Sequence, residues 1–109
     1  MTELTEPTYW VRIYASGPIE AAKQAIREDC LREGLCVTIE PTTFIYTGGE
    51  EEGFCVGLIQ YPRFPSPESD IWQRAVGLAK KIRTATFQHS TLIMDATQTL
   101  WLSERDGNK

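Results

Sequence analysis

The chain has 109 residues, of which 41% are hydrophobic and 24% are charged, as expected for one soluble globular domain with an ordinary core. Its formal net charge of −4 argues against a nucleic-acid partner, because such affinity comes largely from clustered Lys and Arg. No apolar run approaches the ~20 residues of a membrane-spanning helix, and the polar residues 1–7 do not resemble a secretory signal. We therefore expect a cytoplasmic protein.

Three cysteines without a CxxC pair predict free thiols in a reducing compartment. One histidine and three scattered cysteines lack the paired spacing of a zinc site, and the acidic run 50–52 lacks the spaced oxygen ligands of a calcium loop. No phosphate-binding glycine motif is present. We therefore expect neither a metal nor a cofactor.

The first half of the chain predicts a strand, a helix and a hairpin. Residues 9–15 alternate as a strand does, and an amphipathic stretch after Ser16 predicts a helix that Ser16 caps and Gly34 ends. Residues 35–40 and 42–46 are extended on either side of Pro41, which indicates one bent strand or two short ones. Residues 48–53 predict a flexible turn into a strand at 54–61. That strand is apolar at odd and even positions alike, so the sequence does not show which of its two faces meets the helices.

The second half predicts a rigid loop, a helix and two strands. Residues 62–67 hold three prolines and cannot form regular structure. Ser66 or Ser69 then caps a helix, followed by strands at 91–95 and 99–103 with a turn at 96–98. The apolar face expected for this helix comprises Ile71, Ala75, Leu78, Ala79 and Ile82, widened by Trp72 and Val76.

This order of elements predicts an α+β, ferredoxin-like (split βαβ) antiparallel sheet with two helices on one face and a short C-terminal strand. Right-handed crossovers would place the first and third strands side by side at the centre. We expect a single domain at 8–103, with polar tails at 1–7 and 104–109.

Two short helices can cover only one face of such a sheet, which leaves an apolar face open. A homo-oligomer, in the simplest case a dimer, would cover it. A small molecule bound in a cleft and single-stranded nucleic acid stacked on aromatic rings are the alternatives. The residues expected to bind are Trp10, Arg12, Tyr14, Tyr61, Arg63 and Phe64. The segment 61–65 could equally serve only to pack the third strand against the second helix.

His89, the one histidine of the chain, could act as a base for Cys36 or Cys55, which requires contact in space that spacing cannot show. A structural role for all three side chains is the simpler interpretation. Ser90, His89 and Asp95 have the residue types of a hydrolase triad, but no GxSxG elbow surrounds Ser90.

Three runs of the sequence resemble small, uncharacterised accessory proteins of bacteriophages and prophages. These runs are Gly34-Leu35-Cys36-Val37-Thr38, Tyr46-Thr47-Gly48-Gly49-Glu50-Glu51 and Tyr61-Pro62-Arg63-Phe64-Pro65. The resemblance spans most of the chain and implies a viral protein that acts inside a bacterium, on host machinery or defences. It implies no activity and no catalytic residues.

Together these features predict a non-enzymatic, virus-encoded accessory protein that self-associates and engages a bacterial host protein or sequesters a small ligand. A small enzyme that depends on Cys and His is the alternative, and a single-stranded nucleic-acid-binding sheet is the second.

Overall fold

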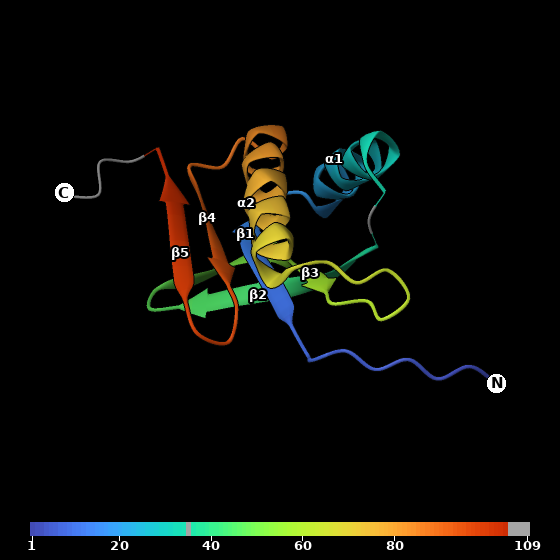
Figure 1. Cartoon of the computed structure of the whole chain (residues 1–109). Coiled ribbons are helices and arrows are strands. Elements are labelled where there is room, and N and C mark those ends of the chain that lie inside the picture. The colour runs from blue at the N-terminus through green and yellow to red at the C-terminus, as the bar shows by residue number, and fades with distance from the viewer. Residues whose placement is uncertain (35, 105–109) are drawn as a thin grey trace.

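The computed structural model describes residues 1–34 and 36–104, which form two helices and five strands. In chain order these are β1 (Trp10–Ser16), α1 (Ile19–Arg32), β2 (Val37–Tyr46), β3 (Gly49–Ile59), α2 (Glu68–Ala85), β4 (Ser90–Met94) and β5 (Thr99–Ser103). The antiparallel sheet has the order β2-β3-β1-β4-β5, with α1 and α2 side by side on one face (Figure 1). The α+β, ferredoxin-like prediction is confirmed, including adjacent β1 and β3 and the added β5.

The N-terminal residues 1–7 run away from the sheet without regular structure (Figure 1). Leu35, which the sequence placed in the second strand, and residues 105–109 of the expected tail lie outside the described residues. We keep 8–103 as the predicted domain. None of the helices in residues 1–34 and 36–104 is both long and apolar enough to cross a membrane.

The structure decides which face of β3 meets the helices. Phe54, Val56 and Leu58 point inward and are at most 1% exposed, because their cross-strand partners on β1 are the inward residues Ala15, Ile13 and Val11. The predicted inward face of α2 is confirmed, and its five apolar side chains are buried against this layer. Cys55, Gly57 and Ile59 therefore face away from the helices.

The hairpin of β2 and β3 is longer than the sequence suggested. Pro41 does not interrupt β2, since β2 is an edge strand where the missing N–H of a proline is tolerated. Glu50, Glu51 and Glu52 are strand residues rather than a flexible turn, because β2 continues to Tyr46 and pairs with them. The turn is confined to positions 47 and 48, where Gly48 has φ +91°.

The predicted helix ends are wrong in detail. Ser16 stays in β1, and α1 begins after Pro18 without a side-chain cap. Its last turn ends at Glu33, whose φ of −150° is extended, and not at a left-handed Gly34. α2 begins after Pro67, and neither Ser66 nor Ser69 caps it. Pro18 and Pro67 occupy the cap positions themselves, so no side-chain oxygen is present there to accept a helix N–H.

Candidate functional site

The sheet face opposite the helices, which we call the open face, carries one outward row at the centre of the sheet. The strand register places its members side by side, and they are Glu40, Cys55, Tyr14, Leu92 and Trp101. Trp101 is 51% exposed. The open face is therefore apolar and aromatic toward β4 and β5.

A cavity of about 550 Å³ lies on the open face between the end of the β2–β3 hairpin and the strands β4 and β5. The twist of the sheet creates it, since β2 and β3 cross β4 and β5 at a steep angle (Figure 1). We call it the open-face cavity. Its lining includes Tyr14, Ser16, Phe44, Tyr46, Glu51 and Trp101.

The side chains of this cavity are of two kinds. Four aromatic rings line it among the described residues, on positions 14, 44, 46 and 101, together with one charged group, the carboxylate of Glu51. Ser16 Oγ donates a hydrogen bond of 2.8 Å to Glu51 Oε1. Flat rings with a single anionic group suit a ligand that has both an aromatic ring and a positive charge.

Gly53 sets the position of the Phe44 ring in this cavity. A Cβ at this glycine would collide with the ring of Phe44 and with the carbonyl oxygen of Ala15. The ring therefore lies directly against β3 over Gly53, two residues along the strand from Glu51, which is the cross-strand partner of Phe44. A larger residue at position 53 would push the ring into the cavity.

Three of the six predicted binding residues lie on the open face. Trp10, Arg12 and Tyr14 are outward residues of β1, and the Arg12 guanidinium lies 5.0 Å from the centroid of the Trp10 ring. Tyr14 lines the open-face cavity, while Trp10 pairs with Ile59 at the opposite end of β3. The structure thus brings one predicted residue, Tyr14, into this cavity.

The other three form a separate group on the loop after β3. Tyr61 and Phe64 stack at 6.1 Å between centroids, and the Arg63 guanidinium lies 5.3 Å from the Phe64 ring. The amide of Gln60 closes the loop, donating to the Ser66 carbonyl at 2.7 Å and accepting from its N–H at 2.9 Å. This loop borders a second, apolar cavity of about 570 Å³.

The predicted thiol and imidazole candidates are dispersed. Cys36 borders the second cavity and Cys55 lies on the open face, while His89 precedes β4. Burial raises the pKa of the Cys55 thiol, which Tyr14 and Arg12 only partly oppose. Within the described part of the chain, no hydrogen bond joins His89 to either thiol. No group of three or more His, Cys, Asp or Glu in residues 1–34 and 36–104 could hold a metal ion.

A third cavity, of about 470 Å³, lies where residues 8 and 9 meet the turn at Asp95. Tyr9 Oη donates to Asp95 Oδ2 at 2.8 Å, and the N–H groups of Thr97 and Gln98 donate to Oδ1 at 2.8 and 2.9 Å. The Asp95 carboxylate in this third cavity therefore already accepts hydrogen bonds that hold the turn between β4 and β5.

Sequence reasoning missed the main residues of the open-face cavity. Phe44, Tyr46 and Glu51 lie in the segment interpreted as a broken strand and a flexible turn, and Ser16 was interpreted as a cap. The alternation of Thr42, Phe44 and Tyr46 was the available signal. Nothing in the sequence indicated that the hairpin end approaches β4 and β5.

These features define an antiparallel α+β domain with an aromatic cavity on the sheet face away from its helices. No protein-family model and no curated protein matches the chain. Similar solved structures include a phage SAM lyase in complex with S-methyl-5′-thioadenosine (TM-score 0.74, 14% identity, 94% of this chain and 95% of that one). A phage SAM lyase in the apo state has a TM-score of 0.71 at 16% identity, over 97% of each chain.

A more distant similarity is to the periplasmic divalent cation tolerance protein CutA from Archaeoglobus fulgidus, with a TM-score of 0.51 at 15% identity over 92% of this chain and 87% of that one. At these identities the shared property is the fold. The expectation of a non-enzymatic binding protein is nevertheless wrong on this comparison, because two of the similar structures are of an enzyme from phage.

Proposed function

We propose that this protein is a lyase that cleaves SAM (S-adenosylmethionine) in the open-face cavity and releases S-methyl-5′-thioadenosine. The observation that carries the proposal is the similarity in fold to phage SAM lyases over 94% and 97% of this chain. The cavity supports it independently, because its rings and its carboxylate suit the adenine ring and the positive charges of SAM.

The reaction breaks the bond between the sulfonium sulfur and the four-carbon amino-acid chain. The bonding electron pair goes to sulfur, which loses its positive charge and becomes the thioether of S-methyl-5′-thioadenosine. The four-carbon chain either closes on its own carboxylate to form a lactone, or gives the proton of the carbon next to the broken C–S bond to a buffer base and forms an alkene. Both routes balance without an oxidant, a reductant or addition of water.

The cavity would act on this reaction through binding of the substrate. Its aromatic faces attract the sulfonium, and Glu51 would attract the cationic substrate into the cavity. The cavity is open to water, since Trp101 is 51% and Tyr46 is 54% exposed, so these side chains would hold and orient SAM.

The biological setting forms part of the same proposal. A phage-encoded protein would act in the cytoplasm of the bacterial host, where SAM is available. We also propose that the chain self-associates as a homo-oligomer, because Trp101 at 51% and Ile59 at 52% exposure leave apolar surface on the open face. Native mass spectrometry would report the number of subunits and any retained nucleoside.

The test is to incubate the purified protein with SAM and to quantify S-methyl-5′-thioadenosine and the four-carbon product by mass spectrometry. We expect release well above that from SAM alone, which corrects for spontaneous breakdown. Glu51→Gln should weaken binding of the cationic substrate and so reduce the rate several-fold at low SAM concentration. Glu50→Gln is the matched control, because Glu50 lies next to it on the opposite face of the hairpin. Wild-type release equal to that of SAM alone would disprove the proposal.

A further inference from the structure

We infer that Ser16 is a positioning residue for Glu51, and that the carboxylate held in this way makes the open-face cavity select a sulfonium ligand over a neutral thioether. The inference rests on the proposed function, and it adds the basis of ligand selection at that site.

Ser16 is placed to hold a side chain of the hairpin. It is the last residue of β1, from which the chain turns toward α1. Its Oγ donates to Glu51 Oε1 at 2.8 Å, and the next N–H, of Gly17, donates to the Glu52 carbonyl at 3.2 Å. Two adjacent hydrogen bonds therefore join the end of β1 to the hairpin, one to its side chain and one to its backbone.

This arrangement leaves one carboxylate oxygen of Glu51 for a ligand. Oε1 accepts the Ser16 hydroxyl, whereas Oε2 has no protein donor within the described residues. An exposed glutamate without such a donor samples several rotamers, and ordering it on binding costs side-chain entropy. The Ser16 hydroxyl reduces that cost, because it holds the carboxylate before the ligand arrives.

The charge of the cavity determines which ligands it binds more tightly. No Lys or Arg is among the described residues that line it, so Glu51 is not neutralised there. A sulfonium close to this carboxylate gains an attraction that a thioether of the same shape does not. The aromatic rings act in the same direction, since their faces attract cations. The attraction ends when the sulfonium loses its charge, which favours release of the neutral product.

The test compares two ligands that the protein cannot cleave. One is the analogue of SAM in which a protonated tertiary nitrogen replaces the sulfonium, and the other is S-adenosylhomocysteine, the neutral thioether with the same amino-acid chain. Calorimetry gives the dissociation constant of each, below pH 7 where the nitrogen is protonated. We expect the wild type to bind the cationic analogue at least tenfold more tightly.

The variants separate positioning from folding. Glu51→Gln should reduce the preference for the cationic analogue over S-adenosylhomocysteine to about twofold or less. Ser16→Ala should reduce the same preference several-fold, while the affinity for S-adenosylhomocysteine stays within about twofold of the wild type. Ser16→Thr keeps the hydroxyl and should restore the preference, and Glu50→Gln should leave it unchanged. If Ser16 had only a structural role, Ser16→Ala would weaken the binding of both ligands equally.

The outcomes distinguish this inference from the proposed function. A preference that persists in Ser16→Ala, or its absence in the wild type, overturns the inference even if SAM is cleaved. Selective binding without release of S-methyl-5′-thioadenosine from SAM overturns the lyase proposal and supports the basis of selection. Failure of the folded wild type to bind either analogue at millimolar concentration overturns both.

Discussion

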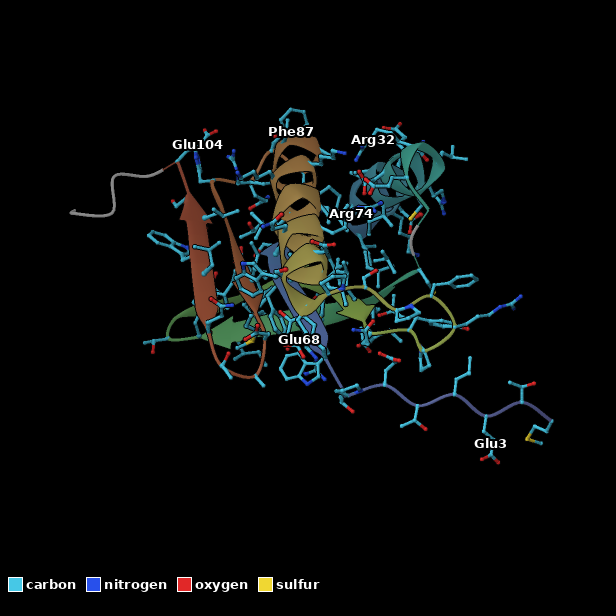
Figure 2. The ribbon with its side chains drawn as sticks, in the orientation of Figure 1. Glu3, Arg32, Glu68, Arg74, Phe87 and Glu104 are labelled. Carbon is cyan, nitrogen blue, oxygen red and sulfur yellow. The ribbon has the colours of Figure 1, made fainter. Side chains whose placement is uncertain are left out.

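The guanidinium of Arg74 on α2 donates two hydrogen bonds to one oxygen of Asp29 on α1, from Nε at 3.2 Å and from Nη2 at 3.1 Å to Oδ2. Arg32 Nη2 donates to the other oxygen at 2.7 Å, and Lys81 also donates to it. The Asp29 side chain is only 2% exposed. Figure 2 labels Arg32 and Arg74 at the junction of the two helices. A buried acid with three cationic partners thus fastens α1 to α2.

Replacing this acid should lower the stability of the fold. We expect Asp29→Asn to reduce the free energy of unfolding by about 2 kcal/mol, because three cations lose their charged acceptor at a largely buried position. Urea denaturation measures it. The matched control on the same helix is Glu28→Gln, which removes an exposed charge and keeps an acceptor for Gln24, and which should change stability by less than about 0.5 kcal/mol. Equal effects of the two substitutions would contradict a fastening role for Asp29.

Stability should decline in acid through two carboxylates. Burial by itself would raise the pKa of Asp29, but the hydrogen bonds from its cationic partners lower it from 3.8 to about 2. Asp95 has the same balance between burial and donated hydrogen bonds, and its pKa is also about 2. A lowered pKa means that the folded state favours the ionised form. The contribution of these two carboxylates to the free energy of unfolding is therefore fully present above about pH 5 and is lost progressively as the pH falls through 3.8 toward 2.

The measurement for this acid dependence is a series of urea unfolding curves between about pH 6 and pH 2. We expect a plateau at the upper end and a decline below about pH 4. Asp29→Asn should flatten the decline, because one of the two linked groups no longer takes up a proton. An unchanged slope in that variant would contradict the assignment.

Gly53→Ala should damage the open-face cavity, because the new Cβ meets the Phe44 ring and the Ala15 carbonyl oxygen. We expect a loss of about 1–3 kcal/mol of stability and reduced release of S-methyl-5′-thioadenosine. Gly77→Ala is the control, since Gly77 lies in α2 with nothing within 4 Å of the new atom. That variant should gain about 0.5–1 kcal/mol and keep the release. Full release by Gly53→Ala would show that the position of the Phe44 ring is irrelevant.

Alkylation rates should separate the cysteines. Cys36 is exposed and should react first with iodoacetamide near neutral pH, whereas Cys55 is half-buried with a raised pKa and should react slowly. Cys55→Ser and His89→Gln should keep the release of S-methyl-5′-thioadenosine. Fast labelling of Cys55 together with loss of release in Cys55→Ser would instead support thiol chemistry.

The sequence by itself determined the order of the elements and the class of fold, though not the ends of every element. Alternation at Val11 and Ile13, and helical spacing from Ile71 to Ile82, are local patterns with periods that only a strand and a helix satisfy. The order of these elements then allowed few antiparallel arrangements with right-handed crossovers. The ferredoxin-like sheet, the inward face of α2 and the existence of an uncovered sheet face followed from that reasoning.

Only the tertiary structure decided which face of β3 is inward and which residues meet on the open face. Phe54 and Cys55 are both apolar, so the register with β1 had to choose between them. The meeting of Ser16 with Glu51 depends on the length and twist of the hairpin, and that of Asp29 with Arg74 on the packing of two helices. Such contacts join residues 35 and 45 positions apart, and no local period of a sequence records them.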